Sequence, residues 1–162
     1  MPDEVIADTS PLQYLHQTGC LELLPQLYGS ILVPEAVVAE LDVGRQRGVV
    51  LPDPDRLPWI RTVAAPHRDV LSLAVDLGPG EREVLALAAG RAGSLALLDD
   101  RLARHFARHL NVAFTGTLGV LLKAKTVGHL NAVRPILDRL QALGFWLAPA
   151  TRQAALRLAG ED

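Results

Sequence analysis

Short aliphatic runs alternate along the chain with longer segments in which apolar residues recur at helical spacing. The runs lie at residues 5–7, 31–33, 95–98 and 112–114. Runs of this length, rich in Val, Ile and Leu, are typical of buried strands, whereas the longer segments are typical of amphipathic helices. The alternation predicts an α/β domain with a mainly parallel central sheet.

Turn residues and apolar spacing predict several helices between these strands. The segment 34–41 begins with a proline, which suits the first position of a helix, and carries three aliphatic side chains on one face. A Gly-Pro-Gly sequence interrupts the chain directly before a helix predicted over 81–89. Further helices are expected at 70–75, 101–110, 116–125, 132–143 and 152–158, and a late strand at 145–147. Four prolines predict an irregular connection over 50–67.

Composition indicates a globular protein with a single domain, residues 1–162. Hydrophobic residues make up 49% and charged residues 21% of the chain, whose length is sufficient for a core without disulfides. The one cysteine, Cys20, cannot form an internal disulfide, and no Cys/His cluster has zinc-ligand spacing. The N-terminus lacks the pattern of a signal peptide, and no apolar run is long enough to span a bilayer. We therefore expect a soluble, cytoplasmic protein with no membrane partner.

The formal net charge of −2 does not indicate a nucleic-acid-binding protein, so any such role must depend on local features. One predicted helix presents Arg101, Arg104 and Arg108 on a shared face, where they could contact phosphates. The alternative is an ordinary solvated basic face. The two tryptophans, Trp59 and Trp146, are expected to pack within the protein rather than to stack on bases.

Two aspartates follow predicted strands. Asp8 comes directly after the first strand, and Asp99 directly after a later, central one. Ligands of open α/β sheets gather beyond the carboxyl ends of the strands, so both carboxylates are expected at the same edge. Either residue alone could equally serve a turn or cap a helix. The pair together suggests a site.

Two glutamates are further candidates. Glu40 is expected late in its helix, where the dipole disfavours a negative charge, so it is either exposed to solvent or close to a cation. Glu81 lies in the first turn of its helix, where the dipole favours a carboxylate that starts the helix or binds metal. Glu83 should point to another side of that helix, towards solvent. The sequence leaves both alternatives open for Glu40 and Glu81.

A divalent cation would be needed if these carboxylates converge. The group would consist of Asp8, Glu40, Glu81 and Asp99, and four negative charges repel one another strongly. Oxygen ligands select Mg²⁺ or Mn²⁺. Such ions activate water and stabilise charge on the leaving oxygen of a phosphodiester, so the group predicts metal-assisted hydrolysis.

The order of these acids, with their surroundings, resembles the PIN-domain family over nearly the whole chain. Four motifs carry the resemblance: Asp-Thr-Ser-Pro-Leu at 8–12, Gly-Glu at 80–81, Leu-Leu-Asp-Asp-Arg at 97–101 and Thr-Gly-Thr at 115–117. The chain looks closest to bacterial and archaeal PIN proteins related to VapC-type toxins. The resemblance implies a three-layer α/β/α fold, a Mg²⁺ or Mn²⁺ site and an endoribonuclease that hydrolyses RNA. For a toxin it also implies a cognate antitoxin protein and, commonly, a homodimer.

The resemblance also implies roles for neighbours of the acids. The family's third acid is commonly Asp, whereas this chain has Glu81, whose longer arm could change the metal geometry. Asp99 is followed by Asp100, so either could be the fourth metal ligand. Asp99 is preferred, with Asp100 as a helix cap or a second ligand. Three hydroxyl residues are expected to support the site, with local turn capping as the alternative. They are Thr9, Ser10 and Thr115.

The main alternative function is a binding module that keeps the fold and acts through protein or RNA partners, with little or no catalysis. The glutamate at the third acidic position is the reason to consider it. The presence of all four acids favours the enzyme instead.

Overall fold

A five-stranded parallel sheet forms the centre of the part of the chain that the structure describes. The computed structural model describes residues 1–69 and 71–162 with their side chains, and residue 70 by its backbone alone. The strands are β1 (Glu4–Ala7), β2 (Ile31–Pro34), β3 (Ile60–Val63), β4 (Ser94–Leu97) and β5 (Ala113–Thr115). They are ordered β3-β2-β1-β4-β5, and each neighbouring pair is parallel. The predicted parallel α/β sheet is confirmed.

The inner strands are hydrophobic along most of their length because helices cover both faces of the sheet. Val5, Ile6 and Ala7 of β1 are at most 2% exposed, and β2 is buried at every position. Continuous burial, rather than alternation, is typical of parallel strands between two helical layers. The edge strand β3 differs, since its two middle residues are exposed.

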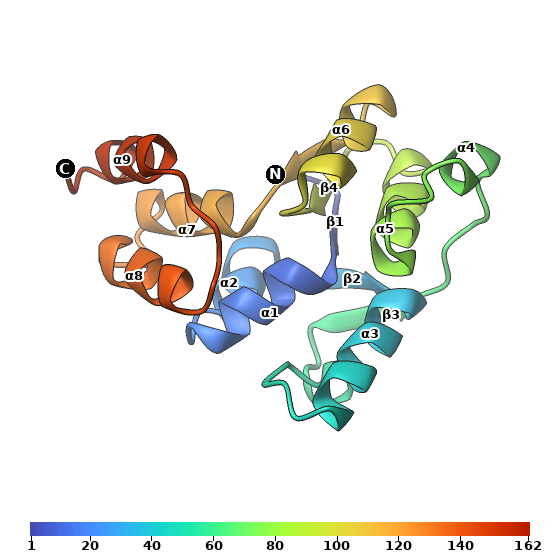
Figure 1. Cartoon of the computed structure of the whole chain (residues 1–162), viewed down its shortest axis with the longest axis horizontal. Coiled ribbons are helices and arrows are strands. Elements are labelled where there is room, and N and C mark those ends of the chain that lie inside the picture. The colour runs from blue at the N-terminus through green and yellow to red at the C-terminus, as the bar shows by residue number, and fades with distance from the viewer.

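Helices form the two outer layers. The segments before β4 give α1 (Thr9–Gln17), α2 (Leu23–Tyr28), α3 (Glu35–Gln46), the 3₁₀ turn η1 (Pro54–Arg56), α4 (Asp69–Ser72) and α5 (Pro79–Ala89). The later ones give α6 (Arg101–His109), α7 (Thr117–Thr126), α8 (Arg134–Ala142) and α9 (Pro149–Leu158). Figure 1 shows α5 to the right of the strands and α2 with α7 to their left, with α8 and α9 beyond α7. This arrangement confirms the predicted three-layer α/β/α fold.

The strand β3 lies inside the segment 50–67, for which the prolines predict an irregular connection. Its residues contain no proline, so each backbone N–H is present and the strand can pair with β2 in register from Ile31↔Ile60 to Pro34↔Val63. The prediction is therefore wrong for this strand. The prolines on both sides of this short, half-exposed edge strand led to the wrong prediction. Its β-branched residues are the feature of the sequence that indicates a strand.

A loop takes the place of the late strand predicted at 145–147. Phe145 packs edge to face against Tyr14 of α1, with ring centroids 5.0 Å apart, and Leu147 is buried. These contacts account for the apolar residues without strand pairing. Trp146, between them, is 81% exposed, so the expectation that it packs within the protein is also wrong, whereas Trp59 does pack against the core.

None of the described helices is both long and apolar enough to cross a bilayer. The one cysteine, Cys20, is buried and unpaired, as expected.

Candidate active site

Asp8 and Asp99 lie at the point where the sheet order reverses. The chain moves from β1 to β2 and β3 on one side and then returns to place β4 and β5 on the other side of β1. The carboxyl ends of the two strands at such a point form the usual ligand crevice of a doubly wound sheet. Asp8 follows β1 directly, and its N–H donates to the carbonyl of Leu97, two residues before Asp99 (3.1 Å). The shared edge predicted for the two aspartates is therefore observed.

The carboxylate of Asp8 lies in a strongly acidic, desolvated environment. Asp8 is only 4% exposed. The pKa of Asp8 is raised to about 7, mainly by burial. A hydrogen bond with the backbone of Thr9 partly offsets this shift, and the negative charges of Glu81, Glu40 and Asp99, in that order, contribute to it. The four candidate carboxylates thus share one neighbourhood, although they come from four separate segments of the chain.

Asp99 is held by one residue on the far side of β5. The N–H of Thr117 donates to Asp99 Oδ1 (2.8 Å), and Thr117 Oγ1 donates to Asp99 Oδ2 (2.7 Å). Burial raises the pKa of Asp99, whereas these two hydrogen bonds and the charge of Arg104 lower it. The sequence did not predict that Thr117 supports the site, although Thr117 is the last residue of the Thr-Gly-Thr motif.

The hydroxyl groups predicted to support the site have different partners. Thr115, at the end of β5, directs its Oγ1 against Gly119 of α7, so the hydroxyl that reaches Asp99 belongs to Thr117 instead. Thr9 Oγ1 donates to Glu40 Oε2 (3.2 Å). Ser10 is half-buried in the first turn of α1. Of the three, Thr9 is the one whose hydroxyl is hydrogen-bonded to a candidate acid.

Glu40 was expected near the end of its helix, but it lies in the middle of α3. The helix α3 starts at Glu35, with Pro34 as its N-cap residue, and continues to Gln46. The carboxylate of Glu40 faces the N-terminus of α5, where the N–H of Gly80 donates to its Oε1 (3.0 Å). The prediction that a helix dipole disfavours the charge of Glu40 is therefore wrong. The carboxylate lies at the N-terminus of α5, and the positive end of that helix dipole favours a negative charge.

Glu81 is the third residue of α5, which begins at Pro79, two residues before the predicted start. Burial raises the pKa of Glu81, with further upward contributions from the charges of Asp100 and Glu40 and an opposing one from a backbone hydrogen bond with Gly78. Asp100 is exposed and caps α6, since the N–H of Ala103 donates to its Oδ2 (2.9 Å). The capping alternative for Asp100 is therefore observed, and its charge still acts on Glu81.

Glu83 was expected to be solvated, and this expectation is wrong. Its Oε1 accepts a hydrogen bond from the N–H of Ala36 in the first turn of α3 (2.9 Å). The side chain does leave α5 in a different direction from Glu81, as its spacing requires. That direction leads to the neighbouring helix instead of to solvent.

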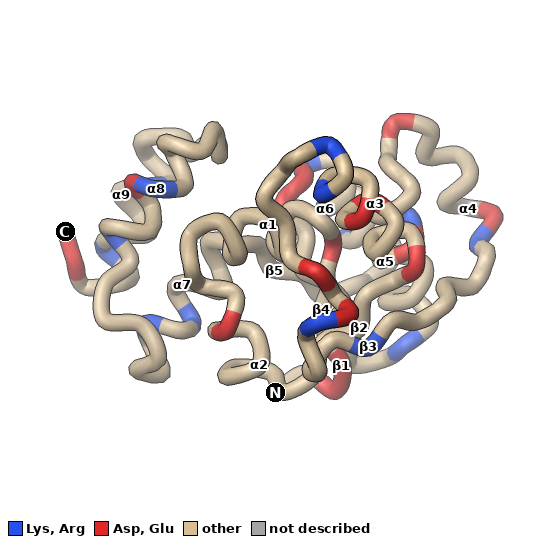
Figure 2. The backbone as a smooth tube through the Cα atoms, turned by 90° about the horizontal axis from the view of Figure 1, so that it is seen from below, with Lys and Arg blue, Asp and Glu red and all other residues tan. Residues whose placement is uncertain are grey.

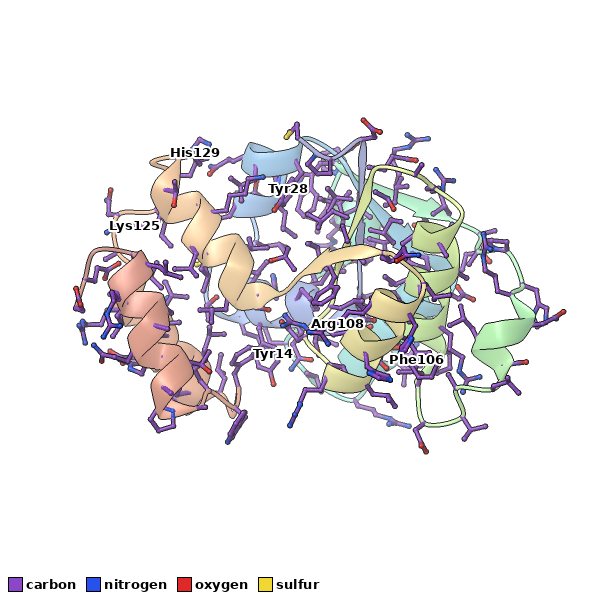
Figure 3. All side chains as sticks on the ribbon, turned by 90° about the horizontal axis from the view of Figure 1, so that it is seen from above. Tyr14, Tyr28, Phe106, Arg108, Lys125 and His129 are labelled. Carbon is purple, nitrogen blue, oxygen red and sulfur yellow. The ribbon has the colours of Figure 1, made fainter. Side chains whose placement is uncertain are left out.

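The basic residues of α6 border the acidic group. Figure 2 shows acidic and basic positions close together around α6. Arg104 donates from Nε to the carbonyl of Leu98 (2.7 Å), and its guanidinium lies 5.4 Å from the ring centroid of Phe114. Arg108, labelled in Figure 3, lies 5.1 Å from the same centroid, while Arg101 is exposed. The basic face of α6 is thus partly fixed against Phe114 of β5.

The four candidate carboxylates are suitable ligands for a divalent cation, but their side chains are not already arranged around a common ion position. Among the described residues, no group of three or more Asp, Glu, His or Cys side chains is arranged to hold an ion as it stands. Glu40 and Asp99 are hydrogen-bonded to protein N–H and O–H groups instead. The carboxylate oxygens nevertheless match Mg²⁺ or Mn²⁺, and a cation would offset the mutual repulsion that Asp8 experiences.

The sequence comparison agrees with this architecture. The family model described as a PIN domain matches residues 4–161. The chain therefore belongs to the PIN-domain family, whose fold is of the nuclease type and whose members typically use divalent metal ions. Neither the curated proteins nor the solved structures gave a match.

Proposed function

We propose that this protein is a metal-dependent endoribonuclease that hydrolyses RNA phosphodiester bonds. The observation that carries the proposal is the environment of Asp8, a buried carboxylate at the switch point of the sheet with three further acids around it. Isolated buried charges are costly, so such a group is best explained by a cation that binds it. Family membership supports the same reaction class.

In this proposal the cation is Mg²⁺ or Mn²⁺, held by Asp8, Glu40, Glu81 and Asp99. When bound, it would lower the pKa of water and offset negative charge on the phosphate and the leaving oxygen. Thr117 keeps the oxygens of Asp99 at a fixed orientation through its two hydrogen bonds. Thr9 does the same for one oxygen of Glu40. Asp100, as a cap of α6 close to Glu81, adds negative charge at the rim.

RNA would be held mainly through its backbone. Arg104 is anchored by its Nε and its contact with Phe114, so its remaining N–H groups are preorganised to bind phosphate. Arg108 and Arg101 continue the same basic surface along α6. Phosphate contacts of this kind position a substrate without reading its sequence.

The biological role proposed is that of the toxin in a toxin-antitoxin pair. It is supported by the four motifs that resemble VapC-type proteins. The role includes a cognate antitoxin protein, a homodimer and a cytoplasmic location as further parts of the proposal. The second candidate, a PIN-fold binding module, is favoured by one observation: Glu40 and Asp99 are already satisfied by protein donors.

Cleavage of a mixed pool of structured and single-stranded RNAs tests the proposal. The parent protein and Asp8→Asn are each incubated with Mg²⁺, Mn²⁺ or EDTA. The proposal expects cutting by the parent with either metal, no cutting in EDTA, and a loss of at least about a hundredfold in Asp8→Asn. No cutting by the parent would favour the binding module.

A further inference from the structure

Two helices of the candidate site hold each other through reciprocal hydrogen bonds. Glu40 of α3 accepts from the N–H of Gly80 in α5 (3.0 Å), and Glu83 of α5 accepts from the N–H of Ala36 in α3 (2.9 Å). Gly80 and Ala36 are each the second residue of their helix. We call these two contacts the α3–α5 latch.

The latch uses groups that every helix leaves unpaired. The first N–H groups of an α-helix have no partner within the helix and carry partial positive charge. Each helix of the pair therefore supplies the carboxylate that the start of the other one requires. Helix α3 also packs extensively along α5, so the two contacts lie at a continuous helix–helix interface.

One half of the latch belongs to the acidic group and the other half does not. Glu40 is one of the four candidate acids, and Gly80 directly precedes Glu81, another of them. The helices approach closely here, because a Cβ on Gly80 would collide with Glu40 Oε1 and lie 2.8 Å from Oε2. Glu83 lies one helical turn beyond Gly80, where it holds the start of α3 and not the carboxylates themselves. Its contact fixes the direction in which α3 leaves β2.

We infer that Glu83 is a positioning residue for cation binding. It acts through α3: by holding the N-terminus of that helix against α5, it fixes the separation of Glu40 and Glu81. The inference rests on the proposed metal site. Residues that orient metal ligands without contacting the ion typically change metal affinity by about 10- to 100-fold when they are removed.

Titration of Mn²⁺ by calorimetry, without RNA, tests this role in four proteins. They are the parent, Glu83→Ala, Glu83→Gln and Glu35→Ala. Glu83→Gln keeps a carbonyl oxygen that can accept from Ala36 but lacks the charge. Glu35 is exposed in the same first turn of α3, so Glu35→Ala controls for the loss of one nearby negative charge.

The expected result is a Kd for Mn²⁺ raised about tenfold in Glu83→Ala and changed by less than about threefold in Glu83→Gln and Glu35→Ala. Equal Kd values for the parent and Glu83→Ala would overturn the inference, even if Glu83→Ala melts at a lower temperature. A Kd in Glu83→Gln as high as that in Glu83→Ala would also overturn it, since charge and not position would be responsible. Failure of the parent itself to bind Mn²⁺ would instead overturn the proposed function.

Discussion

Thr117 donates two hydrogen bonds to one carboxylate, that of Asp99: its N–H to Oδ1 at 2.8 Å and its hydroxyl to Oδ2 at 2.7 Å. Thr117 is the first residue of α7 and is fully buried. The start of α7 therefore fixes both oxygens of an acid that follows β4. The contact joins two segments that the sheet already places side by side, since β4 pairs with β5.

Replacement of Thr117 by Val tests how far this contact controls Asp99. The hydroxyl is lost while size is kept, so Asp99 Oδ2 loses its donor and the unfolding free energy should fall by about 1–2 kcal/mol. Mn²⁺ binding should weaken roughly tenfold. Thr115→Val is the matched control, because Thr115 faces Gly119 and not Asp99. Equal Mn²⁺ affinities in the two variants would contradict this account.

Gly80→Ala tests the close approach of α3 and α5. Alanine is normally better than glycine in a helix by about 1 kcal/mol, but here its Cβ would collide with the carboxylate of Glu40. We expect a net loss of roughly 1–3 kcal/mol in urea unfolding. Gly78→Ala is the control, since a Cβ there has nothing within 4 Å. In a Glu40→Ala background the cost of Gly80→Ala should disappear, and persistence of the full cost would show that Glu40 is not its cause.

The pKa of Asp8 predicts how the metal-free protein responds to pH. Its folded value of about 7 exceeds the ordinary 3.8, so between these pH values the folded state holds a proton that the unfolded chain has released. The contribution to stability is therefore complete below pH 4 and is lost as pH rises through 7, by at most about 4 kcal/mol. Asp8→Asn removes this titration.

Urea unfolding in EDTA at pH 5 and pH 8 checks the prediction for Asp8. The parent should lose stability relative to Asp8→Asn as the pH is raised, and Mn²⁺ at pH 8 should restore stability to the parent alone. A difference between the two proteins that stays the same at both pH values would refute the assigned environment of Asp8.

Arg104→Gln tests the proposed contact with the RNA backbone. The change removes a preorganised cation, so the KM for RNA should rise roughly tenfold and the salt dependence of binding should weaken by about one phosphate contact. Arg56→Gln is the control, because Arg56 is 87% exposed and lies in η1 outside the candidate site. An identical KM and salt slope for Arg104→Gln and the parent would exclude Arg104 from the RNA surface.

The sheet and the placement of Asp8 and Asp99 could be predicted because both depend on local sequence. Buried parallel strands are continuous aliphatic runs, and an acid that follows each run must lie at the carboxyl edge. The motif order then predicted the family, which the comparison confirms over residues 4–161. These inferences required no knowledge of how helices pack.

The contacts that hold the acids could not be predicted because they depend on helix packing. Glu40 and Gly80 are 40 positions apart, and only the approach of α3 to α5 brings them together. The same approach turns Glu83 from a solvated residue into the partner of Ala36. Of the Thr-Gly-Thr motif, Thr115 was expected to support the site, but it is Thr117, at the start of α7, whose hydroxyl reaches Asp99.

Anomalous scattering from a Mn²⁺-soaked crystal tests the central claim most directly. The account predicts one strong peak beyond the carboxyl ends of β1 and β4, with oxygens of Asp8 and Asp99 at about 2.1 Å from it. Glu40 or Glu81 should have rotated towards the same ion. A peak that contacts neither Asp8 nor Asp99, or the lack of any peak at this edge at saturating Mn²⁺, would contradict the account.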